Sequence, residues 1–176
     1  MAAIVASISR ARPSGMFRSS KVTLPTLALL ACLAPGAAGA AERSRPAQVL
    51  LEQISCAVPP APASVLYFFR DIGLISNKPT RVADSLNYFK LKKPLDLDGV
   101  QAVAVFGFDE TGTFPFVRAP GTSPGQVIGF VAKTSKPKII EWADNGHGGK
   151  AIQIEDQSDF GPGYIEAYCN KLPPRD

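Results

Sequence analysis

Residues 86–108 read LNYFKLKKPLDLDGVQAVAVFGF, two largely apolar runs separated by a short connection of Pro, Asp and Gly. These connecting residues are typical of turns, so the stretch predicts two consecutive strands. The second strand, residues 100–108, is apolar at almost every position. A strand that is apolar on both faces needs cover on both faces, which predicts a central place in its sheet.

The sequence on either side of this stretch predicts the helices and strands that would pack against the central strand. Apolar residues at helical spacing indicate two helices before it, and a further strand and a third helix follow it. Two strands with clean alternation come last, which indicates a peripheral antiparallel hairpin. The predicted fold class is therefore α+β, an antiparallel sheet of about five strands with helices packed on one face, in the order α-α-β-β-β-α-β-β. The predicted helices are residues 46–57, 63–72 and 136–144, and the predicted strands beyond the first two are 126–133, 150–155 and 164–169.

The first 40 residues have the layout of a secretory signal peptide. Basic residues come first, an apolar run covers 22–33, and small residues lead to Ala40. The apolar run is too short to span a bilayer, which takes about 20 residues. We expect cleavage after Ala40, which leaves 41–176 as a single domain that is periplasmic or secreted. The leader and the Ala/Pro/Gly-rich composition indicate a bacterial envelope protein.

A second interpretation of the leader concerns Cys32. The residues Leu29-Leu30-Ala31-Cys32 resemble a lipoprotein box, in which the cysteine is lipidated and anchors the protein to the membrane. The Ala-x-Ala site at the end of the leader favours ordinary cleavage instead. Both interpretations place the domain outside the cytoplasm, and membrane contact is expected only if Cys32 is lipidated.

Removing the leader changes the charge and the cysteine count. Residues 41–176 hold 15 basic and 15 acidic residues, because all the excess positive charge lies in the leader. A domain without net charge gives no reason to expect nucleic acid as a partner. Two cysteines remain, Cys56 and Cys169. In an oxidising compartment they are expected to form a disulfide that joins the first helix to the last strand.

Residues 109–125 form the most unusual segment, with three prolines and three glycines between two predicted strands. Long connections in small domains are often functional. Phe114 and Phe116 flank a proline, and Arg118 follows, so these three residues are the predicted ligand or partner contacts. The competing interpretation is a short extra strand over residues 113–118 with both aromatic rings packed on the sheet.

The sequence offers few residues for catalysis. Its single histidine, His147, lies among glycines, where we expect it to be exposed and mobile and a poor general base. The spacing of His and Cys predicts no metal site, and the Asp96-Leu97-Asp98-Gly99 run fits an ordinary turn better than a calcium loop. No catalytic residue and no cofactor are predicted. Carboxylates such as Asp109 or Glu110 with Glu155 or Glu166 are the remaining catalytic pairs.

The resulting hypothesis is a small exported domain that binds an unknown protein or small molecule without catalysis. The alternatives are a small periplasmic hydrolase that uses dispersed carboxylates, and an inhibitor of another enzyme.

Overall fold

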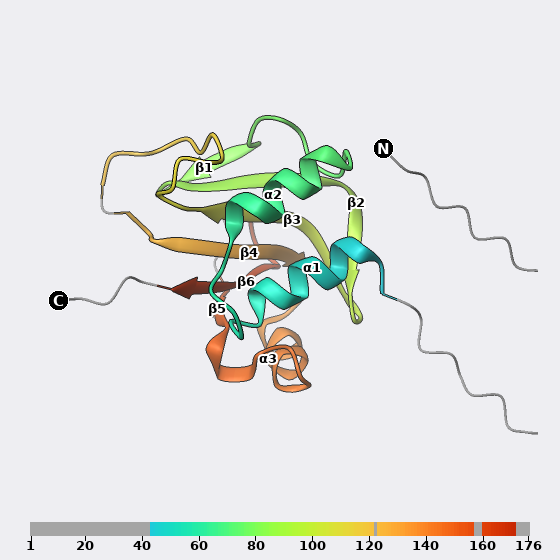
Figure 1. The fold of residues 1–176 in the computed structure, drawn as a ribbon. Coiled ribbons are helices and arrows are strands. Elements are labelled where there is room, and N and C mark those ends of the chain that lie inside the picture. Colours follow the sequence, from blue (N-terminus) through green and yellow to red (C-terminus); the bar gives the residue numbers. More distant parts are fainter. Residues whose placement is uncertain (1–42, 122, 157–159, 172–176) are drawn as a thin grey trace, which may run out of the picture. The chain divides into compact units, whose positions relative to one another are not determined.

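The computed structural model describes residues 43–121, 123–156 and 160–171, and Figure 1 shows their arrangement. The predicted signal peptide and Cys32 lie outside these residues. Within the described residues there are three α-helices, one 3₁₀ turn and one six-stranded sheet. The helical elements are α1 (Arg45–Ile54), α2 (Pro62–Asp71), α3 (Lys136–Asp144) and the 3₁₀ turn η1 (Gly149–Ala151). The strands are β1 (Arg81–Ala83), β2 (Leu86–Leu97), β3 (Val100–Phe108), β4 (Gln126–Lys133), β5 (Gln153–Glu155) and β6 (Tyr164–Lys171).

The sheet confirms the predicted fold class and the central place of β3. All neighbouring strands are antiparallel, in the order β1-β2-β3-β4-β6-β5. The prediction of five strands missed β1, whose three residues are too few to give a period-two pattern. The prediction of a peripheral final hairpin was wrong for β6, which pairs with β4 along its whole length. Of the two strands of the hairpin, only β5 lies at an edge of the sheet.

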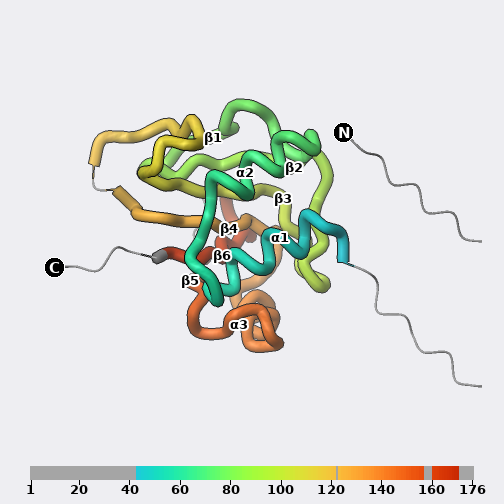
Figure 2. The backbone as a smooth tube through the Cα atoms, in the orientation of Figure 1, coloured from blue at the N-terminus to red at the C-terminus, as the bar shows by residue number. Residues whose placement is uncertain are grey.

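One face of the sheet carries the main core. Buried residues of all three helices pack there in one cluster with residues of β2, β3, β4 and β6, so the helices share a face as predicted. The tube in Figure 2 shows α1 and α2 crossing in front of the strands. A smaller cluster lies on the other face, around the rings of Tyr88 and Phe106. Strand β3 is therefore covered on both sides, which accounts for its apolar sequence.

The turn between β2 and β3 consists of Asp98 and Gly99 alone. Both have positive φ, 54° and 89°, as in the type I′ turns that match the twist of a two-stranded hairpin. The backbone N–H of Gly99 donates to the side chain of Asp96 at 2.7 Å. The expectation of an ordinary turn here is confirmed, and the turn fixes where the Asp98 side chain leaves the sheet.

The described residues of the segment 109–125, which are 109–121 and 123–125, form neither a strand nor a detached loop. The buried side chain of Asn87 donates from Nδ2 to the carbonyl of Val117 and accepts at Oδ1 from its N–H, both at 2.9 Å. Ser85 accepts a third bond, from the N–H of Ala119 at 3.0 Å. Asn87 on β2 and Ser85 just before it therefore bind this segment as the backbone of a neighbouring strand would.

The disulfide between Cys56 and Cys169 is confirmed. It joins the end of α1 to β6 across 113 residues, with the two Cα atoms 5.4 Å apart. Such a bond is compatible with an extracellular location. Among the described residues, no helix combines the length and the hydropathy needed to cross a membrane.

Candidate ligand-binding cleft

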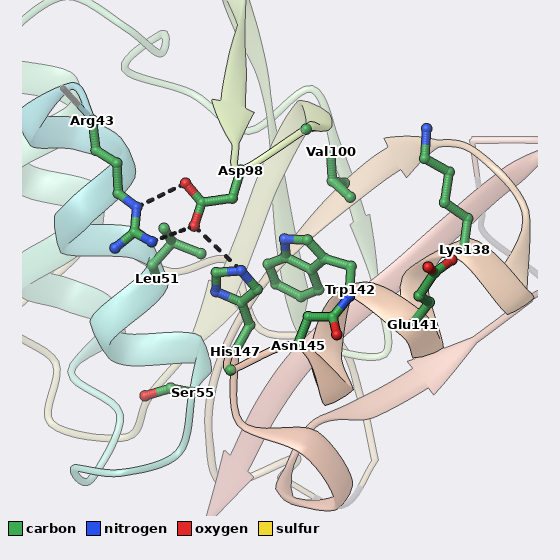
Figure 3. Close-up of a pocket in the computed structure, with 12 residues that line it drawn as sticks. Arg43, Leu51, Ser55, Asp98, Val100, Lys138, Glu141, Trp142, Asn145 and His147 are labelled. Carbon is green, nitrogen blue, oxygen red and sulfur yellow. Dashed lines mark hydrogen bonds and ion pairs between the residues drawn. The ribbon is translucent and has the colours of Figure 1, made fainter. Parts of the chain in front are cut away.

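A cleft of about 860 Å³ lies between α1, the β2–β3 turn and the end of α3 (Figure 3). Its size falls within the range of about 300–1,000 Å³ that small-molecule sites occupy. The lining combines a few apolar side chains with charged and amide groups. The lining residues are Arg43, Leu51, Ser55, Asp98, Gly99, Val100, Lys138, Glu141, Trp142, Asn145, Gly146 and His147.

Asp98 is bound on one side by Arg43. The guanidinium donates from Nε to Oδ1 at 2.7 Å, and its Nη2 lies 2.6 Å from Oδ2. This two-point geometry is the strongest form of an arginine–carboxylate pair. Because the side chain of Arg43 is 52% exposed, solvent screens the ion pair. The pair therefore orients the Asp98 carboxylate more than it stabilises the fold.

His147 binds the same carboxylate from the other side. Its Nε2 lies 3.2 Å from Oδ2 of Asp98, and its ring stacks on Trp142 with centroids 4.5 Å apart and planes 11° apart. The indole is fixed in turn, because its Nε1 donates to the carbonyl of Leu97 at 2.6 Å. Figure 3 shows His147 between Asp98 and Trp142.

The prediction that His147 is exposed was wrong. Its side chain is only 12% exposed and makes two specific contacts. The glycines around it serve to build a tight turn after α3: Gly146 and Gly148 have φ of 105° and 108°. A Cβ on Gly148 would lie 2.7 Å from the carbonyl oxygen of Ser55, so only glycine lets this turn pack against the end of α1.

The pKa of His147 lies below its ordinary value of 6.5. Burial is the largest cause, since it penalises the charged ring, and Arg43 lowers the pKa further, while Asp98 acts in the opposite direction. The folded protein therefore holds His147 neutral at neutral pH. The stability that comes from this neutral ring is present above pH 6.5 and is lost as the pH falls through 6.5 towards the lower folded pKa.

Two substitutions should move this pKa in opposite directions. Arg43→Gln removes a nearby positive charge, so we expect the pKa of His147 to rise. Asp98→Asn removes the carboxylate that favours the charged ring, so we expect the pKa to fall further. Since the chain has one histidine, its imidazole NMR signals can be titrated without overlap. If the pKa of His147 stays the same in both variants, then Arg43 and Asp98 do not lie close enough to His147 to affect its charge.

The structure places the three predicted contact residues differently from one another. Phe114 is 2% exposed and packs edge-on against Tyr67 and Phe89 in the main core. Phe116 is half-buried beside Phe114. Arg118 is exposed, and its guanidinium lies 5.4 Å from the centre of the Phe108 ring. Their role in binding stays a prediction, but Phe114 also has a structural role.

This difference can be measured. Phe114→Leu should lower the free energy of unfolding by about 1–2 kcal/mol, because it changes the shape of a packed core side chain. Arg118→Ala, at an exposed position, should change it by no more than about 0.5 kcal/mol. Chemical denaturation of the two variants tests this. Equal effects of the two substitutions would contradict a buried Phe114 and an exposed Arg118.

Glu155 and Glu166 were predicted as alternative partners of Asp109 or Glu110, whereas the structure pairs these two glutamates with each other. They are direct partners across β5 and β6. Each accepts a hydrogen bond from a tyrosine, Glu155 from Tyr168 at 2.5 Å and Glu166 from Tyr88 at 3.3 Å. Burial raises the pKa of Tyr168, and its hydrogen bond to Glu155 raises it further. The pair is thus integrated into the sheet face opposite the helices.

The carboxylate of Asp109 binds backbone N–H groups instead. Its carboxylate accepts from the N–H of Ala63 at 3.3 Å, near the start of α2, and from the N–H of Thr111 at 3.0 Å. Across residues 43–121, 123–156 and 160–171, no three His, Cys, Asp or Glu side chains are grouped so that they could hold a metal ion.

Comparison with known proteins gives no indication of the function. The sequence matches no protein-family model, no curated protein and no solved structure. Any functional conclusion therefore rests on the residues of the cleft.

Proposed function

We propose that this protein is an exported, non-catalytic binding domain that takes a small polar molecule into the cleft between α1, the β2–β3 turn and α3. The observation that carries the proposal is the fixed arrangement of Arg43, Asp98, His147 and Trp142 at one end of a cleft of about 860 Å³. Each side chain in this group is held by another, so a ligand meets polar groups whose orientation is already set.

Binding fits this arrangement better than hydrolysis does. Both oxygens of Asp98 are already engaged by cationic or N–H groups. Ser55 is the hydroxyl that lines the cleft, but it donates to the carbonyl of Glu52 at 2.8 Å, and Figure 3 shows it turned away from His147. A serine nucleophile has to lie within hydrogen-bond reach of its base. The predicted hydrolase relied on two carboxylates, and since Asp98 is already bound by Arg43 and His147, the hydrolase alternative ranks second.

The proposal is tested with a library of small polar molecules. The single tryptophan lies in the cleft, so its fluorescence reports directly on occupancy. A true ligand should change Trp142 emission saturably and raise the melting temperature, because it binds only the folded state. Asn145→Ala, at the cleft, should weaken both effects, whereas Asn77→Ala, at an exposed position outside the cleft, should not. Stabilising compounds that all leave Trp142 emission unchanged would contradict the proposal.

Export is the second part of the proposal, and the predicted leader and the disulfide support it. We expect the intact mass of the protein from the envelope fraction to correspond to a chain that starts at Ala41, with two hydrogens gained on reduction. A mass that starts at a diacylated Cys32 would instead indicate a lipoprotein at the membrane surface. A mass that retains the leader would contradict processing altogether.

A second candidate surface is the exposed part of residues 109–125. Val117 is 48% exposed, and Arg118 beside it is exposed as well. Because Asn87 and Ser85 hold this segment in place, it presents a defined shape to a protein partner. Arg118→Ala should weaken partner binding without loss of stability if this surface is used. An inhibitor of another enzyme would act through such a surface.

A further inference from the structure

We propose that the ligand of the cleft is a neutral saccharide, bound through its hydroxyl groups by the side chains on the two sides of Trp142. This inference rests on the proposed function and names the chemical class of its ligand. Charge, hydrogen-bonding capacity and the apolar floor of the cleft support it in turn.

The charges in the cleft cancel. Arg43 is paired with Asp98, and Lys138 and Glu141 are neighbours one turn apart on α3. Burial keeps His147 on the neutral side of its titration at neutral pH. A cleft without net charge gives no electrostatic preference for an anion or a cation. It therefore favours a ligand that is itself uncharged.

The hydrogen-bonding groups are of both kinds. Lys138 and the Arg43 guanidinium can only donate, whereas the Glu141 carboxylate can only accept. The amide of Asn145 does both, and the Nδ1 of His147, the ring nitrogen that does not face Asp98, accepts when the ring is protonated on Nε2. A hydroxyl group donates one hydrogen bond and accepts others. A ligand with many hydroxyls can therefore satisfy this mixture of groups.

The floor of the cleft is apolar. Leu51, Val100 and Trp142 line it between the polar walls, and because each is at most 8% exposed and the His147 ring stacks on Trp142, they offer a ligand only a small apolar area. Figure 3 shows polar side chains on either side of Trp142 and Val100. A sugar ring carries C–H groups beside its hydroxyls, so one part of the ring can meet this small apolar area while its hydroxyls meet the polar walls.

The test is a titration of the purified protein, followed by Trp142 fluorescence and by calorimetry. The saccharide probes are maltotriose, cellotriose and the trisaccharide of N-acetylglucosamine; the zwitterion glycylglycine and the anion citrate serve as comparisons. We expect saturable binding of at least one saccharide with a Kd of about 1 mM or tighter, and little change in affinity with added salt, because no net charge is recognised. Asn145→Ala should weaken it about tenfold through lost hydrogen bonds, and Asn77→Ala should leave it unchanged.

Two outcomes would overturn the inference, and they differ in what they imply. If glycylglycine or citrate binds, quenches or enhances Trp142 emission and loses affinity with salt while the saccharides do not bind, the cleft is a ligand site for charged molecules, and only the saccharide class is wrong. If no probe changes Trp142 emission and the screen for small polar ligands also fails, the proposed function is wrong as well.

Discussion

Replacing Cys56 and Cys169 together by serine is expected to lower the free energy of unfolding by about 3–5 kcal/mol. The disulfide closes a loop between residues 113 positions apart, so its loss gives the unfolded chain far more conformational freedom. Single domains of this size are stable by only about 5–15 kcal/mol, which makes this loss a large fraction of the total. Denaturation of the oxidised protein, the reduced protein and the double serine variant measures it.

The same substitution should also disturb the cleft. Cys56 directly follows Ser55, and the backbone of Ser55 packs against Gly148 in the turn that carries His147. When the end of α1 is no longer tied to β6, this packing is expected to loosen, and the pKa of His147 should move back towards 6.5 as its burial decreases. A loss of less than about 1 kcal/mol would show that the disulfide constrains the unfolded chain little. An unchanged His147 titration would show that the cleft is independent of the disulfide.

The second large effect is expected from Asn87→Ala, with a loss of about 2–4 kcal/mol in the free energy of unfolding. Asn87 is fully buried and makes three hydrogen bonds, two with the backbone of Val117 and one to the carbonyl of Ser85 at 2.7 Å. Alanine removes all three bonds and leaves backbone groups of residue 117 without their partners. It also leaves space where the amide packed. Residues 109–125 should then exchange their amide hydrogens faster with solvent.

Asn77→Ala is the matched control for this substitution. Asn77 is exposed, and its replacement should change the free energy of unfolding by no more than about 0.5 kcal/mol. If Asn87→Ala is as mild as the control, or if hydrogen exchange in residues 109–125 is unchanged, then the side chain of Asn87 does not hold this segment.

Much of the fold could be predicted because local signals agreed with the tertiary structure. The Asp98–Gly99 turn has a sequence typical of two-residue hairpins, and β3 lies where its apolar run predicts. Strand β2 continues through Pro94 to Leu97, residues that the sequence analysis placed in the connection, with an irregular register between Lys90 and Leu95. Strand β4 and helix α3 also have the predicted bounds. The prediction failed where few residues carry the signal, as in β1, and where the pairing of strands depends on distant parts of the chain, as for β6.

The cleft was missed because its contacts are not local. Arg43 and Asp98 are 55 residues apart, and nothing in either local sequence indicates that they meet. A signal did exist in the sequence: its single tryptophan and its single histidine are five residues apart at the end of a predicted helix. The glycines around His147 were interpreted as mobility, whereas they allow the close turn that packs on Ser55.

The central claim is that the cleft around Trp142 and His147 is the binding site. Its most direct test is a two-dimensional NMR spectrum of the labelled protein, recorded with and without the library of small polar molecules, the trisaccharides included. Our account predicts that the indole N–H of Trp142, the imidazole of His147 and the backbone amide of Asn145 shift together, while the amides of Val117 and Arg118 do not. Shifts confined to Val117 and Arg118, or no shifts at all, would contradict it.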